Sequence, residues 1–162
     1  GCSTGNIGNA LKPTLDSRAA NFIPIESSKE MADLYNGPNK ENLLIDDVTD
    51  IEIPEFDVAI CFLVLMFIPP ERRQELVDRL RASRKKGGAI IIFDKLESPH
   101  GYIGTVMWRM ALAGKVATGV DPTDIISKEL SLMGTQRPLM YDETTDMTQV
   151  FQFGNFAGWV ID

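Results

Sequence analysis

The sequence is poor in the residues that would place it in several common protein classes. It holds only two cysteines, Cys2 and Cys61, which is too few for a disulfide framework and indicates a reducing, cytoplasmic location. It has no secretory signal and no lipidation motif, and the apolar run from Val58 to Pro69 is too short to cross a bilayer. No G-K-[ST] follows a glycine loop, so a P-loop is excluded. We therefore expect neither a membrane protein nor a P-loop enzyme, and we expect no metal site.

Positive charge is also scarce. Lysine and arginine number 16 against 23 aspartates and glutamates, which gives a net charge of -7. Because an acidic chain repels a phosphate backbone, we do not expect it to bind nucleic acid directly. The one basic cluster, at 79–86, is interpreted as a solvated helix end. The length of 162 residues and the 44% hydrophobic content predict a single domain over 1–162 with a substantial core.

The first eight residues form the most informative motif. Gly1 to Gly8 reads G-C-S-T-G-N-I-G, a small-residue loop whose backbone can approach a ligand closely. About 18 residues later an apolar run, 22–25, ends at Glu26. This layout is typical of a nucleotide-type site, with a glycine turn after the first strand and a ribose-binding carboxylate after the second. Since the loop begins at residue 1, we expect the first strand to be missing from these residues.

Alternating strand and helix patterns predict an α/β fold with a Rossmann-like, mainly parallel sheet. The run 56–62 is apolar except for Asp57 and indicates a strand buried on both faces. Pro13 is expected to shorten the first helix, and Gly87-Gly88 to end the third. A closing strand pair joined at Gly154-Asn155 predicts an antiparallel edge strand. Expected strands are 21–25, 42–45, 56–62, 89–93, 148–153 and 156–161; expected helices are 6–15, 29–35, 70–85 and two in a helical cover, 98–133.

Four segments in this order resemble the class I S-adenosylmethionine methyltransferases: 1–8, 25–31, Asp46-Asp47-Val48 and 86–92. The resemblance implies S-adenosyl-L-methionine (SAM) as cofactor. It also implies roles for particular residues. The loop would cradle the methionine moiety, the carboxylate after the second strand would hold the ribose, and the acidic pair would reach the adenine, with Asp46 as the alternative to Asp47. The implied cofactor-binding residues are Gly1, Cys2, Ser3, Gly5, Glu26, Ser27, Asp47, Val48, Cys61 and Phe62.

Two further segments, 58–72 and 151–156, resemble the carboxy-S-adenosylmethionine synthase family, formerly described as tRNA wobble-uridine methyltransferases. That resemblance implies prephenate as carboxyl donor and a downstream place in tRNA modification. Family members have a carboxylate-reading arginine where this chain has Lys128-Glu129-Leu130-Ser131. We therefore expect an ordinary methyltransferase acting on an unidentified small molecule. The synthase, with a prephenate-like anion as second substrate, is the alternative.

Other hypotheses remain open. A non-catalytic SAM-binding module is favoured by the lack of an obvious base, since His100 is the only histidine. Methyl transfer from a sulfonium mainly needs in-line positioning, so we assign no catalytic residue. A nicotinamide oxidoreductase of the short-chain type would need a Tyr-x-x-x-Lys pair, which we do not find. Arg109 and Arg137 are the cations that could meet an anionic substrate, although a surface role is the expectation for each. We expect Trp108, Met107 and Met110 in the core, with a substrate lid as the alternative, and a homodimer is left open.

Overall fold

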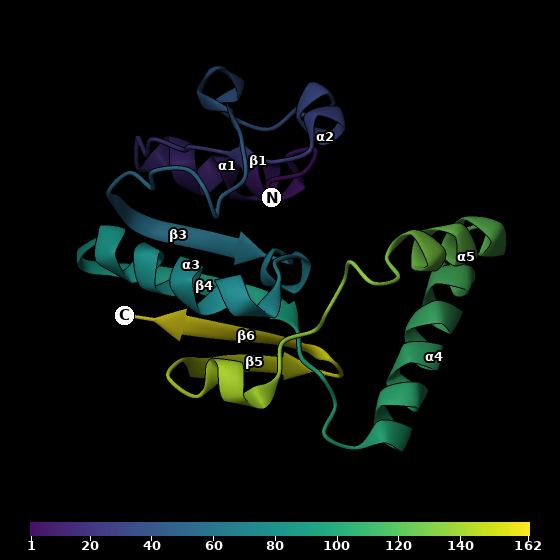
Figure 1. The fold of residues 1–162 in the computed structure, drawn as a ribbon. Helices are drawn as coiled ribbons and strands as arrows, with labels where there is room; N and C mark the ends of the chain where they lie inside the picture. Colours follow the sequence, from purple (N-terminus) through teal and green to yellow (C-terminus); the bar gives the residue numbers. More distant parts are fainter.

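The computed structural model describes residues 1–162 and contains two β-sheets (Figure 1). The smaller sheet pairs β1 (Ile25–Glu26) with β2 (Leu44–Ile45) in parallel. The larger sheet has the order β3-β4-β6-β5, formed by β3 (Phe56–Phe62), β4 (Arg84–Lys95), β6 (Phe156–Ile161) and β5 (Thr148–Phe153). β3 and β4 run parallel, whereas β6 is antiparallel to both of its neighbours. The expected α/β fold with an antiparallel edge is confirmed.

Within residues 1–162 no strand joins the two sheets, so β3 lies at an edge of the larger sheet. The expectation that β3 is buried on both faces is wrong. Its Cys61 side faces the core, but Val58, Ile60 and Phe62 on the other face are 54%, 39% and 37% exposed. An apolar run in the sequence predicts a strand with few polar side chains, but it does not show which other elements cover its two faces.

The helices follow the expected order with two corrections. α1 (Asn6–Ser17) continues through Pro13, which therefore does not shorten it. α2 (Lys29–Asp33) begins after Ser28, whose hydroxyl accepts the Met31 N–H at 3.3 Å. α3 (Pro70–Ser83) ends before Gly87-Gly88, which lies inside β4, where Gly88 passes too close to the Asp57 carbonyl for a side chain. Three 3-10 turns complete the chain: Lys40–Asn42, Leu65–Phe67 and Tyr141–Thr144.

The core lies between α3 and one face of the larger sheet. Leu76, Val77 and Leu80 of α3 pack with Ile90 and Ile92 of β4, all of them at most 4% exposed. This stripe holds α3 along the sheet, so the turn before α3 is fixed next to the carboxyl end of β3. The other buried residues of this core are Cys61, Leu65, Ile68, Leu96, Leu139, Ala157, Trp159 and Ile161.

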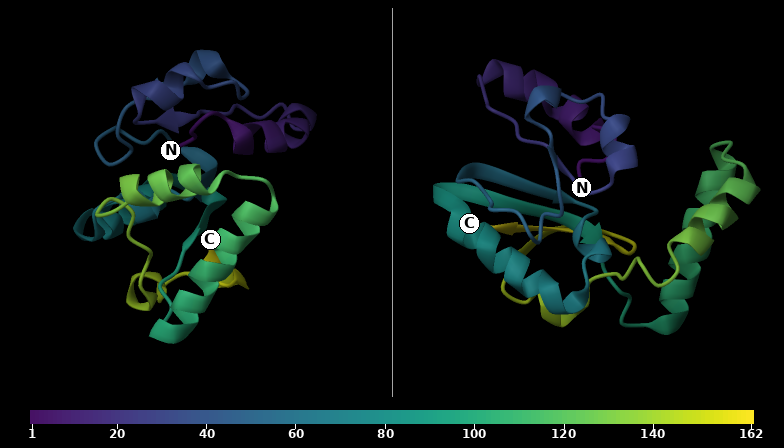
Figure 2. Two further views of the ribbon diagram at one scale, coloured as in Figure 1. Left: turned by 90° about the vertical axis from the view of Figure 1, so that its right-hand side faces the viewer. Right: turned by 45° about the horizontal axis from the view of Figure 1, so that its top comes forward.

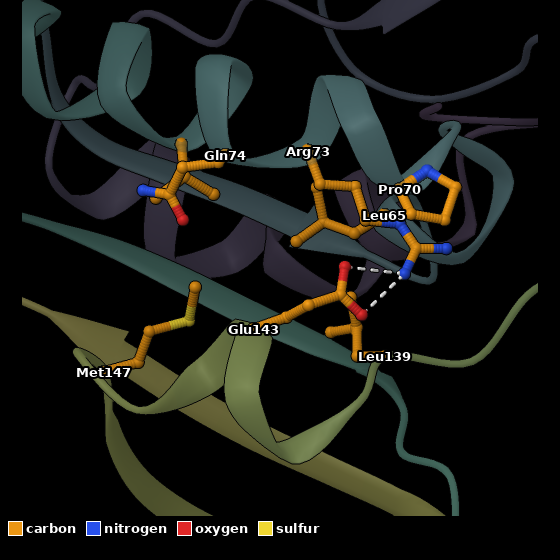
Figure 3. A pocket seen from close by; sticks show the side chains of 8 residues that line it. Leu65, Pro70, Arg73, Gln74, Leu139, Glu143 and Met147 are labelled. Atoms are coloured by element: carbon orange, nitrogen blue, oxygen red, sulfur yellow. Dashed lines mark hydrogen bonds and ion pairs between the residues drawn. The ribbon is translucent and has the colours of Figure 1, made fainter.

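A buried ion pair joins α3 to the segment that follows the last helix (Figure 3). Arg73 is 3% exposed, and its Nη1 lies 2.9 and 3.0 Å from the two carboxylate oxygens of Glu143. Its Nε donates to the Ile68 carbonyl and its Nη2 to the Arg137 carbonyl, while Nη1 also lies 3.4 Å from the Pro138 carbonyl. A small cavity of about 50 Å³ lies beside the pair. Because each nitrogen of the buried guanidinium has an acceptor within the protein, this is a structural connection.

The expected helical cover is a two-helix arm, α4 (Gly101–Ala117) and α5 (Pro122–Ser131). It stands off the body beyond the carboxyl ends of β3 and β4 (Figures 1 and 2). α4 has no buried residue. Trp108 and Met110 are 50% and 63% exposed, so the expectation that they belong to the core is wrong. None of the helices is both long and apolar enough to cross a membrane.

Candidate functional site

The glycine loop lies against the ends of two strands. The Cys2 N–H donates to the Ile25 carbonyl of β1 at 2.8 Å. On the other side, a side chain added at Gly1 would meet Val64, just past β3, at 3.4 Å. The loop therefore bridges the two sheets at the edge where their parallel strands end, which is where ligands bind in open α/β sheets.

Glu26 is the centre of this edge. Its side chain is buried at 6% exposure. Oε2 accepts the Ser3 N–H at 2.7 Å, and Oε1 accepts the Ser28 N–H at 2.9 Å. A carboxylate has about four lone-pair sites, so each oxygen keeps one further acceptor position. The glycine loop thus holds the carboxylate in a fixed orientation with two positions left for hydroxyl donors, and Ser27 lies exposed beside it.

The acidic pair after β2 lies next to Glu26. The Asp46 N–H donates to the Glu26 carbonyl at 3.1 Å. Asp47 Oδ1 accepts both the N–H and the hydroxyl of Thr49, at 2.8 and 2.7 Å. These two bonds lower the pKa of Asp47, so the carboxylate is ionised at neutral pH. The Val48 side chain packs against the core, which leaves its main chain for a ligand.

At the end of β3 the structure separates the two residues that the sequence pairs. Cys61 is 7% exposed and belongs to the core, and burial raises the pKa of its thiol to about 11. Its side chain is therefore not part of the site, and only its main chain remains available. Phe62 points to the other face, where it stacks on Phe93 with ring centroids 4.8 Å apart.

Gly5 has a packing role. Its φ is +97°, and a side chain there would come within 2.5 Å of the Gly37 nitrogen. The loop needs glycine at this position so that it can turn into α1 against Gly37, and the side-chain space at Gly5 is filled by protein rather than open to a ligand.

Sequence reasoning missed two features of this edge. Ser3 and Leu63 adopt positive φ values, 50° and 56°, which leucine in particular rarely does. Leu63 is held there because its N–H donates to the Phe93 carbonyl at 2.7 Å. The other missed residue is Lys95, the last residue of β4, whose Nζ donates to Gln136 Oε1 at 2.7 Å. No sequence motif marks Ser3, Leu63 or Lys95 as unusual.

Three further residues were candidates for substrate contact: His100, Arg109 and Arg137. All three are exposed, and none belongs to the strand ends described above. His100 precedes α4, and Arg109 lies on α4. The main chain of Arg137 is held by Met66 and Arg73, while its side chain is exposed. No group of three or more His, Cys, Asp or Glu side chains is arranged to hold a metal ion.

Comparison with known proteins gives consistent results. The carboxy-S-adenosyl-L-methionine synthase of Shewanella loihica is 24% identical over 98% of this chain and 68% of its own length. The plantazolicin methyltransferase BpumL, solved with a substrate analogue and S-adenosylhomocysteine (SAH), matches all of this chain and 74% of its own with a TM-score of 0.62 at 16% identity. Magnesium protoporphyrin IX methyltransferase of Synechocystis PCC 6803, solved with bound SAH, matches 99% and 69% with a TM-score of 0.56 at 13% identity. The family model described as "Methyltransferase domain" matches residues 1–92, more than half of the chain, and the chain therefore belongs to the methyltransferase domain family.

Proposed function

We propose that this chain binds SAM at the carboxyl edge of its strands and transfers the methyl group to a small-molecule acceptor. The observation that carries the proposal is Glu26, a buried carboxylate that two backbone N–H groups orient and that keeps one acceptor position on each oxygen. The two hydroxyls of a ribose match these positions.

The neighbouring groups fit the rest of such a cofactor. Asp47 keeps Oδ2 free of hydrogen bonds within the protein, so it can accept from an adenine amino group. The main chain of Gly1, Cys2 and Ser3 lines the side where the methionine moiety would lie. When bound, SAM supplies an electrophilic methyl group on its sulfonium. The protein then needs to hold the acceptor in line with that group, and positioning of this kind does not require a base.

Carboxy-SAM synthesis, upstream of tRNA modification, is the second candidate. It is favoured by the similarity to synthases that extends over 98% of this chain. That chemistry needs a cation for the added carboxylate, and the segment that carries an arginine in the resembling family carries Glu129 here. The Glu129 carboxylate already accepts from Lys115 and from the Trp108 indole. We therefore expect this chain to prefer ordinary SAM.

Three measurements test the proposal. Calorimetry should show SAH binding and no NAD binding; the opposite result would refute the cofactor assignment. In a competition between SAM and carboxy-SAM, mass spectrometry of the bound species should find SAM, and preferential retention of carboxy-SAM would favour the synthase. Binding of SAM without methyl transfer to any acceptor in a metabolite extract would favour a non-catalytic module.

A further inference from the structure

Lys95 is a partly buried ammonium without a carboxylate partner. It ends β4, next to the point where β3 ends, because Phe62 and Phe93 are register partners and Lys95 lies two residues further. Its only side-chain hydrogen bond is to the neutral amide of Gln136, at 2.7 Å. The ion pairs of the structure involve other lysines and arginines, and none includes Lys95. A charge removed from water in this way normally has a counter-ion.

The charged groups around Lys95 do not neutralise it. On the arm, the Glu129 carboxylate acts to raise the pKa of Lys95, but it is already bound: Lys115 Nζ donates to it at 3.3 Å, and Trp108 Nε1 lies 3.4 Å from it. Asp94 is fully buried and accepts the N–H groups of Met66 and Lys95. Lys115 and Lys128 add positive charge. Burial lowers the pKa of Lys95, and a bound anion would raise it again.

Aromatic residues neighbour Lys95 on its face of the sheet. Phe156 is the cross-strand partner of Lys95, and Phe93 lies two residues before it, so all three share one face of the sheet. The Phe93 and Phe156 rings are stacked with centroids 6.0 Å apart, and Phe62 continues the row. The carboxyl edge therefore presents a flat apolar surface that ends in a positive charge.

We propose that Lys95 binds a carboxylate of the methyl acceptor, whose apolar body lies against Phe93 and Phe156. The inference rests on the proposed function, and it names the class of acceptor as an apolar organic acid. A monoanion fits better than a phosphate dianion, because the single ammonium of Lys95 balances only one negative charge. The net charge of -7 gives no general attraction for anions, so binding would depend on this ammonium.

The test uses benzoate as the probe and the protein saturated with SAH. Calorimetry should show benzoate binding, much weaker binding of the neutral isostere benzamide, and weaker binding of inorganic phosphate. Lys95→Met, which keeps the stem and removes the charge, should weaken benzoate by about tenfold or more. Lys95→Arg should retain more affinity than Lys95→Met. The matched control is Lys86→Met, an exposed lysine at the other end of the same strand, which should bind benzoate like the parent.

The outcomes separate this inference from the proposed function. SAH affinity is measured first for the parent and each variant. If the parent does not bind SAH, the proposed function fails. If SAH binds but benzoate does not, or benzoate binds Lys95→Met as well as it binds the parent, only the role of Lys95 is refuted. If Lys95→Met does not fold, NMR of the parent decides: benzoate should raise the Lys95 pKa, and an unchanged pKa overturns the proposal.

Discussion

Replacing Glu26 by alanine separates ligand binding from loop structure in a way that can be measured. In the parent, each carboxylate oxygen holds one backbone N–H, from Ser3 and from Ser28. Hydrogen bonds to charged groups contribute about 1.5–3 kcal/mol each, but in the variant water can enter the space left by the side chain and solvate the ribose hydroxyls, which recovers part of the loss. Removing two such bonds to ribose hydroxyls should weaken SAH by about 1–3 kcal/mol, or about 5- to 150-fold in Kd.

The same substitution leaves the Ser3 and Ser28 N–H groups without their acceptor. Both lie in partly exposed backbone where water can replace it, so we expect a loss of about 1–2 kcal/mol in unfolding free energy without SAH. Urea unfolding measures this loss. Glu30→Ala, on the exposed side of the first turn of α2, is the control and should leave SAH affinity unchanged.

A ligand lacking the ribose 2′-hydroxyl distinguishes the two effects. If Glu26 binds the ribose, 2′-deoxy-SAH should bind the parent much more weakly than SAH, and the two ligands should bind Glu26→Ala almost equally. Calorimetry of both ligands with parent and variant gives the coupling free energy between Glu26 and the 2′-hydroxyl. If the deoxy ligand loses the same affinity in parent and variant, Glu26 does not contact the ribose, whatever the variant does to stability.

Two further results are expected from the same edge. At pH 8 iodoacetamide should label Cys2 but not Cys61, because a pKa of about 11 leaves Cys61 about 0.1% thiolate and its side chain is buried. Labelling of Cys2 should be slow, since partial burial raises the pKa of its thiol as well, and SAH should slow it further, which peptide mass spectrometry measures. Labelling of native Cys61 would contradict its placement. Gly5→Ala should destabilise the chain by about 2 kcal/mol or more, because of its positive φ and its contact with Gly37, whereas Gly101→Ala, with open space around it, should be near neutral in thermal unfolding.

The sequence predicts correctly those strands whose own residues form a clear apolar or alternating pattern. β3, β5 and β6 have the expected bounds, because each is a clear apolar or alternating run and the last two meet at Gly154-Asn155. The strand expected at 21–25 is reduced to Ile25–Glu26, since a strand exists only as far as a partner pairs with it and β2 offers two residues. Gly87-Gly88 suggested a helix end, but both glycines lie inside β4, in an irregularity between the Arg84 pairing and the regular parallel pairing with β3 that begins at Ala89.

In the candidate site, too, some features could be predicted from the sequence and others could not. The loop, Glu26 and the acidic pair could be placed from the sequence because main-chain topology brings the ends of parallel strands together. The direction of each side chain could not. In a nearly continuous apolar run such as 56–62, the pattern does not show which residues face α3. In the structure Cys61 faces the core and Phe62 lies on the open face.

The charges of the arm show why sequence distance is a poor guide to electrostatics here. In the sequence, Glu129 next to Lys128 suggests a segment that repels a carboxylate. In the fold, Lys115 and Trp108 compensate the Glu129 carboxylate, so much of its repulsion is cancelled. The cation left without a partner is Lys95, from a different element, and it lies at the end of a strand that leads to the site. The acceptor is therefore determined by how the arm and β4 meet, and the segment 128–131 alone does not decide which anion the protein can hold.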